Sequence, residues 1–349
     1  RFNADIASDP GIQEGLPKGK SISLQSGNNT VEFKYSISFI NADQAEKNFS
    51  EISDRSFEEL KESAKEAWEE ELNQIQVKGG TEAQKRTFYT ALYRCYERMV
   101  DITEEGRYYS NYDGKVHQTD RIFYADDWIW DTYLAHHPLR AILDPEMEAD
   151  MMQSYVSMYE QSGWLPTFPV LWGDNPCMNG FHSTITILDN YRKGIRGFDT
   201  GKAYEGMRKN SLSATMLPWR NGPACSLDTF YYANGYYPAL HPGEKETVHL
   251  VHPFERRQSV AITLGHSYDD WALAQMAKEL GKMGDYEYFR EKADNYKELY
   301  WSDKGFFMPR DAEGQWIDID PKFDGGMGGR DYYDENNGWT YIWQPYHAF

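Results

Sequence analysis

Cysteine is scarce in this chain of 349 residues, and Cys95, Cys177 and Cys225 lie far apart with no Cys-x-x-Cys pair. This spacing excludes a disulfide framework and a thiolate zinc site. A basic cluster is also missing, and the formal charge of -19 argues against a nucleic-acid partner, which would need lysine and arginine to release counterions.

The sequence also lacks an apolar run of membrane-spanning length and a signal peptide. It begins at Arg1 rather than at a methionine and stops within an aromatic motif. We therefore expect it to be part of a longer polypeptide, and the missing signal leaves the compartment open.

Aromatic residues, by contrast, are abundant. They make up 15% of the chain, with 26 Tyr and 11 Trp, and each offers a flat apolar face with a polar edge. Such faces are suited to stacking on sugars, although a large helical core that uses many aromatics explains a good part of them. With 40% hydrophobic residues, the chain can bury a hydrophobic core. Its length allows one large domain with an appendage, or two domains of ordinary size.

The N-terminal segment has a β-like pattern. Ser21–Leu24 and Val31–Ile40 flank a Gly-Asn-Asn turn, and the second run alternates apolar and polar residues as a half-buried strand does. Two strands are not stable alone in water, so residues 1–43 are predicted to be the end of a larger β-domain.

A helical period begins near Ser56. Ser56 with Glu59 and Thr81 with Gln84 form two predicted capping boxes, and Gly79-Gly80 is expected to end the first helix. We interpret residues 44–80 as a helical linker and residues 81–349 as a helical domain. Further helices are predicted at Pro145–Gln161, Ser183–Lys193, Gly201–Lys209, Tyr268–Gly281 and Asp285–Tyr300. Long aromatic and proline-rich connections between them are typical of ordered loops that build a site.

The C-terminal stretch combines carboxylates with aromatics. Asp334 and Glu335 precede Trp339, Tyr341 and Trp343, which are spaced two apart. A carboxyl group packed among aromatic rings loses hydration, which raises its pKa toward the value of a general acid in glycoside chemistry. The alternative is that the two acidic residues cap a turn and the tryptophans belong to the core.

Three other aromatic clusters support the same interpretation, and two of them contain carboxylates. Asp126–Thr132 contains three aspartates and two tryptophans, Gly163–Phe168 is a rigid aromatic loop, and Tyr268–Trp271 holds two aspartates. Asp131, between Trp130 and Tyr133, would be buried unless a donor such as a sugar hydroxyl compensates. Asp269 and Asp270 are interpreted as structural, since acidic residues favour the first turn of a helix.

The histidines do not indicate a metal site. His136 and His137 are adjacent, which on a helix turns them about 100 degrees apart, unlike the i, i+4 spacing of a zinc pair. We interpret them and His182 as structural. The glycine-rich segment 325–329 lacks the setting of a nucleotide loop and is expected to be a bend or flap before Glu335.

An ordered set of motifs resembles the bacterial calcium-dependent exo-α-mannosidases of glycoside hydrolase family 92. The matching stretches, in family order, are Trp130–Thr132, Glu160–Pro166, Cys177–His182, Asp189–Gly194, Tyr268–Trp271, Leu280–Lys282 and Glu335–His347.

This resemblance implies a mostly α fold, in which the end of a β-sandwich and a helical linker precede an (α/α)6 toroid that is incomplete at its C-terminus. It implies an inverting exo-α-mannosidase acting on terminal mannose of oligosaccharides or glycoprotein glycans, with Glu335 as the catalytic acid. Asp131, Trp130 and Trp339 are expected to shape the sugar pocket. It further implies calcium, whose ligands are expected mostly beyond residue 349 together with the base, and a periplasmic or secreted location.

The chain departs from the family pattern near the acid. Asn336 replaces a glycine, Gly338 an alanine and Ala348 an aspartate. These changes leave open a glycan-binding protein without catalysis. Another (α/α)6 glycosidase or phosphorylase, acting on glucosides, is a second alternative. The mannosidic linkage is open as well.

Overall fold

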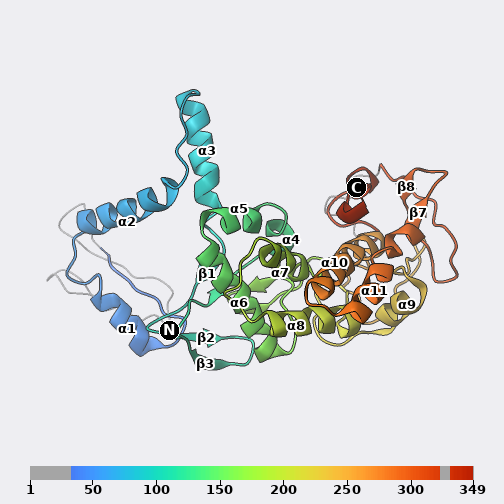
Figure 1. The fold of residues 1–349 in the computed structure, drawn as a ribbon, viewed down its shortest axis with the longest axis horizontal. Helices are drawn as coiled ribbons and strands as arrows, with labels where there is room; N and C mark the ends of the chain where they lie inside the picture. The colour runs from blue at the N-terminus through green and yellow to red at the C-terminus, as the bar shows by residue number, and fades with distance from the viewer. Residues whose placement is uncertain (1–32, 323–330, 349) are drawn as a thin grey trace.

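The computed structural model describes residues 33–322 and 331–348 and is mostly helical (Figure 1). This confirms the mostly α prediction. The closed ring of an (α/α)6 toroid, the β-sandwich and the domain boundaries stay predictions. The expected strand Ser21–Leu24 and the glycine-rich segment 325–329 lie outside the described residues. No helix in the described ranges is both long and apolar enough to cross a bilayer.

Three helices precede the main body, namely α1 (Ala42–Ser50), α2 (Phe57–Leu72) and α3 (Glu82–Arg94). In Figure 1, α2 and α3 project away from the other helices. Both predicted capping boxes are present, at Ser56 with Glu59 and at Thr81 with Gln84, so two orphan donors are satisfied at each N-terminus. The predicted end of α2 is wrong, because the helix stops at Leu72, well before Gly79.

The segment before α1 does not form the predicted strand. Residues 33–38 have no ladder hydrogen bonds, and the alternating Phe33, Tyr35 and Ile37 are 55%, 63% and 59% exposed. Alternation creates an apolar face, but a strand also needs a partner, and no described segment pairs with this one.

Within residues 33–322 and 331–348, four antiparallel pairs of short strands lie beside the helices. The pairs are β1 (Val100–Asp101) with β4 (Tyr124–Ala125), β2 (Arg107–Ser110) with β3 (Lys115–Gln118), β5 (Pro169–Val170) with β6 (Gly173–Asp174), and β7 (Tyr300–Trp301) with β8 (Phe306–Phe307). They fix the loops that lead to and from the helices.

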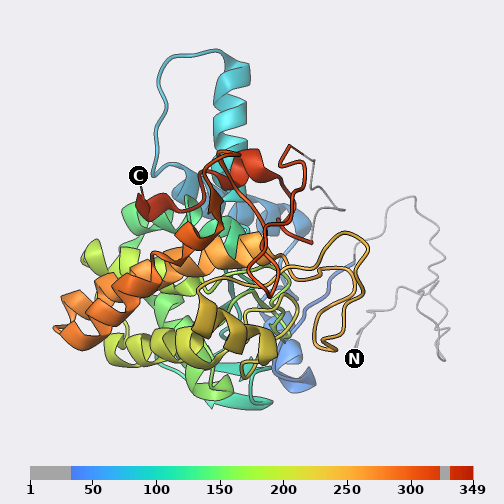
Figure 2. The same ribbon diagram turned by 90° about the vertical axis from the view of Figure 1, so that its right-hand side faces the viewer.

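In the part of the chain that the structure describes, the body consists of α-helices joined by long loops, with short 3-10 turns (Figure 2). These elements are α4 (Ile129–Thr132), α5 (His136–Leu143), α6 (Pro145–Ser162), α7 (Ser183–Arg192), α8 (Thr200–Ser213), α9 (Ser226–Asn234), α10 (Ser259–Glu279), α11 (Met283–Lys292), η1 (Asn295–Leu299), α12 (Gly338–Tyr341) and η3 (Tyr346–Ala348). The predictions for α6 and α7 are confirmed within one residue. Helix α8 is longer than predicted, and the predicted helix Asp285–Tyr300 divides into α11 and η1.

Helix α10 is the centre of the body. It packs against α7, α8 and α11, and 16 of its 21 residues are buried. We predicted a helix that begins at Tyr268, which is wrong, since α10 begins at Ser259. Its first residues are small, β-branched and buried on every side, so they lack the amphipathic period by which a helix is recognised.

The main hydrophobic core lies between α6, α7, α8 and α10. It is rich in methionine, a flexible side chain that fills irregular gaps; Met151, Met152, Met158, Met207 and Met276 are at most 1% exposed. This core holds the ends of the helices in place, and the loops at those ends carry the candidate site.

Candidate active site

Glu335 lies close to Asp131, although 204 positions separate them in the sequence. Partial desolvation, together with the negative charge of Glu335, raises the pKa of Asp131 above its ordinary value, and the Arg98 guanidinium opposes this rise. Asp131 is on α4 and Glu335 lies just before α12. The structure thus brings together two of the carboxylates that we singled out from the sequence.

The expected burial of Glu335 among aromatics is wrong. Its side chain is exposed, and Trp339 and Trp343 are 53% and 62% exposed. The two tryptophans follow Glu335 in sequence but face outward, and Trp339 packs edge-on against Phe306 with the ring centroids 5.1 Å apart. The buried carboxylate of this stretch is its neighbour Asp334, which is inaccessible to solvent.

Asp334 anchors the loop that carries Glu335. The Asn179 side-chain amide donates a hydrogen bond of 3.0 Å to the Asp334 carboxylate and another, of 3.2 Å, to the Gln258 side chain. Gln258 in turn donates to Glu255 at 3.0 Å. The backbone of Asp334 also exchanges hydrogen bonds with the Tyr341 hydroxyl, which donates to its carbonyl at 3.0 Å and accepts from its amide at 3.1 Å.

Glu335 itself has a left-handed backbone, with φ of 53°. This region is unfavourable for residues other than glycine, and such strain concentrates at functional sites. Trp219, Arg256 and Gln258 also have positive φ, at 57°, 59° and 46°. Glu335, Arg256 and Gln258 thus lie on segments that contact one another through the Asn179 hydrogen bonds and an Arg256–Asp331 ion pair of 3.2 Å. The backbone N–H of Trp219 donates to the carbonyl of Pro176, three residues before Asn179.

An exposed indole lies near Asp131. Trp128 is 40% exposed, stacks on Phe168 with centroids 5.5 Å apart, and has the Arg98 guanidinium 3.5 Å from its ring centroid. Arg98 also forms an ion pair of 2.7 Å with Asp126. The loop Gly163–Phe168 and the cluster Asp126–Thr132 are therefore in contact. Nothing in the sequence indicated that Arg98 would be part of this site.

A buried ionic cluster supports this side of the site. His137 contacts the carboxylates of Asp127 at 2.8 Å and Glu148 at 2.7 Å, and the hydroxyl of Tyr155 also donates to Asp127. Although burial opposes its charged form, the two carboxylates raise the pKa of His137 to about 10. Asp127 precedes Trp128, so this charge-compensated cluster fixes the start of the loop that leads to Asp131.

Asp269 has a structural role, as we predicted. It accepts hydrogen bonds from the backbone N–H of Phe181 at 2.6 Å and from the ring of His182 at 2.8 Å. These bonds tie α10 to the loop that contains Asn179. Asp270 is also buried and accepts a hydrogen bond of 2.6 Å from Ser211. The expected reason was wrong, because both aspartates lie in the middle of α10 rather than in its first turn.

The other two residues predicted to shape the sugar pocket, Trp130 and Trp339, lie on different helices. Trp130 is partly buried on α4, next to Asp131. Trp339 faces Phe306 and has the Lys322 ammonium 5.8 Å from its ring centroid. Sequence reasoning missed Asn179 as the partner of Asp334, although Asn179 belongs to the stretch Cys177–His182 that carried the resemblance.

The described residues do not assemble a metal site. Within residues 33–322 and 331–348, no three His, Cys, Asp or Glu side chains gather in a way that could hold an ion. We therefore assign no calcium ligand within these ranges.

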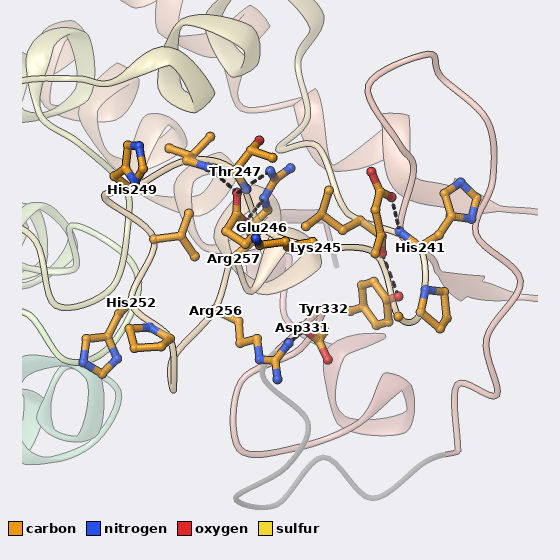
Figure 3. Close-up of a pocket in the computed structure, with 17 residues that line it drawn as sticks. His241, Lys245, Glu246, Thr247, His249, His252, Arg256, Arg257, Asp331 and Tyr332 are labelled. Atoms are coloured by element: carbon orange, nitrogen blue, oxygen red, sulfur yellow. Dashed lines mark hydrogen bonds and ion pairs between the residues drawn. The ribbon is translucent and has the colours of Figure 1, made fainter.

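Two cavities adjoin the loop 238–257, and neither includes Glu335 in its wall. The one of about 540 Å³ is lined by residues of the loop 240–257 together with Asp331 and Tyr332 (Figure 3). The other, of about 380 Å³, lies between the start of α9 and residues 311–313.

A family model, described as the glycosyl hydrolase family 92 catalytic domain, matches residues 44–349. The chain belongs to glycosyl hydrolase family 92. The resemblance inferred from the motifs is thereby confirmed.

Solved structures of family 92 members have the same fold over most of this chain. The inverting mannosidase BT2199 from Bacteroides thetaiotaomicron VPI-5482 is 32% identical with a TM-score of 0.76, and the match covers 89% of this chain and 40% of that one. The α-mannosidase BT3965 from Bacteroides thetaiotaomicron is 27% identical with a TM-score of 0.74, covering 88% and 38%. Our family 92 chain thus spans about two fifths of the length of these relatives. A comparison with curated proteins found no match.

Proposed function

We propose that this chain belongs to an inverting exo-α-mannosidase that removes terminal mannose from α-mannosides, with Glu335 as general acid. Family membership and the descriptions of BT3965 and BT2199 as mannosidases support the activity. The observation that carries the assignment of the acid is the approach of Glu335 to Asp131 on a strained loop that is anchored by a buried carboxylate.

In this mechanism, the Glu335 carboxyl group protonates the glycosidic oxygen as the bond to the leaving group breaks. Asp131 adds negative charge beside Glu335, which complements the positive charge that develops on the sugar ring. A base activates water on the opposite face of the sugar, about 6.5–9.5 Å from the acid in inverting enzymes. Trp130 borders Asp131 and is proposed to contact the sugar, whereas Trp339 is proposed to contact it only at the rim.

Replacing Glu335 by Gln in the full-length polypeptide tests this assignment. We expect turnover of an unactivated mannobioside to fall by about 10²–10⁴-fold, because Gln cannot donate the proton. An aryl α-mannoside with an acidic leaving group should be affected much less. Glu287→Gln, on the exposed surface of α11, is the matched control and should leave both rates unchanged. Near-normal hydrolysis of the mannobioside by the Glu335 variant would exclude Glu335 as the acid.

Calcium dependence is part of the proposal and is supported by the family resemblance alone. A bound calcium ion would supply a hard cation for sugar hydroxyl groups. Thorough chelation of the full-length protein should abolish hydrolysis, and added calcium should restore it. Undiminished activity after chelation would contradict this part. We also propose a periplasmic or secreted location, which cell fractionation tests.

A non-catalytic glycan-binding protein is the second candidate. The exposure of Glu335 and the changes at Asn336 and Gly338 favour it. Calorimetry with mannose and a hydrolysis assay on the same preparation separate the two, since binding without hydrolysis would support the second candidate. Aryl glucosides, assayed beside aryl α-mannosides, test for a different sugar specificity.

A further inference from the structure

The cavity of about 540 Å³ lies next to the loop of the candidate acid. Asp331 and Tyr332 form part of its wall, and Tyr332 is three residues from Glu335. Since consecutive Cα atoms are 3.8 Å apart, the Cα atoms of Tyr332 and Glu335 are separated by at most about 11 Å. The loop 240–257 is linked to the same segment, because Glu255 and Gln258, which flank the lining residues Arg256 and Arg257, continue the hydrogen-bond chain that ends at Asp334.

The charged groups around this cavity compensate one another. Arg257 forms contacts of 2.6 and 2.8 Å with the carboxylate of Glu246. Arg256 pairs with Asp331 at 3.2 Å. Neither guanidinium is left to attract a phosphate or carboxylate. The other two charged residues of the wall, Lys245 and Glu244, have opposite signs, so the wall carries no net formal charge and suits an uncharged polar ligand.

Several polar side chains in the wall are available for such a ligand. Within the described residues, the side chains of Lys245, Thr247 and His249 form no hydrogen bond. Figure 3 shows His249 and His252 on one side of the cavity and His241 on the other. Imidazole and hydroxyl groups both donate and accept, which matches the hydroxyl groups of a sugar.

The hydrogen bonds of the His252 ring make its Nε2 atom a hydrogen-bond donor. Its Nδ1 atom accepts from the backbone N–H groups of Phe254 at 3.3 Å and Glu255 at 3.2 Å, so the proton of the neutral ring resides on Nε2. Desolvation and the nearby Arg220 lower the pKa of His252, which favours the neutral ring. The ring also lies against Trp219, with centroids 4.4 Å apart.

Trp219 gives this side an exposed aromatic face. It is 40% exposed despite a left-handed φ of 57°, an unfavourable backbone conformation for so large a residue. Strain that holds an aromatic ring partly in solvent is typical of a binding position rather than of core packing. Trp219 and His252 together present one stacking surface and one directed donor.

We propose that this cavity, with Trp219 and His252 at one side, binds the sugar units on the leaving-group side of the bond that is cleaved. This inference rests on the proposed function and adds the part of the glycan that the chain recognises beyond the terminal mannose. It makes the loop 240–257 a determinant of preference for oligosaccharides.

Kinetics on two substrates test the proposal in the full-length polypeptide. For Trp219→Ala and for His252→Ala, we expect kcat/KM on α-mannotetraose to fall about tenfold or more, the loss of about 1.4 kcal/mol of binding. An aryl α-mannoside, which has no sugar on that side, should change by less than about twofold. Tyr288→Ala removes an exposed ring from α11, which does not line the cavity, and should change neither substrate.

Thr247→Trp provides a second variant that fills the cavity without removing a core contact, because Thr247 is exposed. It should cause the same selective loss on mannotetraose even if Trp219→Ala does not fold. Equal losses on both substrates, or no loss on either, would overturn the proposal.

Binding measurements separate this inference from the proposed function. If the wild-type protein hydrolyses no α-mannoside, the proposed function fails. Calorimetry with mannotetraose then decides the inference alone: weaker binding by Thr247→Trp than by wild type supports the site. Equal binding by both proteins, or no binding by the wild type, refutes it.

Discussion

The side-chain amide of Asn179 donates a hydrogen bond of 3.0 Å to the carboxylate of Asp334, across 155 positions of the sequence. Both residues are buried, and Asp334 directly precedes Glu335. The position of the candidate acid therefore depends on a contact between two loops that no local sequence signal connects.

Asn179→Ala should affect proton donation more than sugar binding. The variant leaves the buried Asp334 carboxylate without one of its donors, which costs about 1–3 kcal/mol of folding stability and loosens the Glu335 loop. We expect kcat on an unactivated mannobioside to fall at least about tenfold. Kinetics with an aryl α-mannoside that needs no acid should show a much smaller loss. Equal losses on both substrates would mean that Asn179 has only a structural role.

Substitution by alanine is expected to have opposite effects on stability at two helical glycines. A Cβ atom at Gly206 on α8 would lie 2.7 Å from Leu165 Cγ and 3.1 Å from Tyr159 Cγ, whereas at Gly284 on α11 it would meet nothing within 4 Å. Gly206→Ala should therefore destabilise the protein by about 1–3 kcal/mol. Gly284→Ala should stabilise it by about 0.5–1 kcal/mol, because alanine favours the helix. Denaturant unfolding of both variants is the measurement; a stabilising Gly206→Ala would contradict the packing of α8.

Replacing Asp270 by Asn is expected to raise the stability of the folded protein in a pH-dependent way. Burial raises the pKa of Asp270 to about 7 despite the hydrogen bond from Ser211, compared with an ordinary value of 3.8. The folded protein thus binds this proton more tightly than the unfolded chain, so its stability falls as the pH rises from 3.8 through about 7.

Asp270→Asn keeps a partner for Ser211 and removes the cost of the buried charge. It should exceed the wild type in stability at pH 8, by about 1–3 kcal/mol, and match it near pH 4. Asp269→Asn is the contrasting variant and should destabilise at both pH values, because Asp269 accepts from Phe181 and His182 as a carboxylate. Unfolding curves at the two pH values test this; a difference independent of pH would refute the account of Asp270.

Local signals explain what the sequence could predict. The capping boxes at Ser56 and Thr81, and helices α6 and α7, depend on residues within one or two turns of each other, and all were found. The start of α10 was missed because a helix that is buried all round has no polar face. The strand expected at Val31–Ile40 had the right alternation but no described partner.

The candidate site shows a similar division. Motifs in family order pointed to Asp131 and Glu335, and the structure brings these two together. The exposure of Glu335, the burial of Asp334 and the position of Arg98 follow from how distant loops meet, which a single sequence does not encode locally. Glu335 is close to Trp339 in the sequence, but Trp339 does not bury it.

The central position of α10 restricts how this protein can change in length. Inserting one residue after Ser267 would turn everything C-terminal to that point by about 100 degrees, which would carry Asp269 away from His182 and Asp270 away from Ser211. Neighbouring helices on three sides leave no room for the displaced side chains. Insertions and deletions should thus be tolerated only in the loops at its two ends. The length of this helix is therefore fixed, whereas the lengths of the surrounding loops can vary.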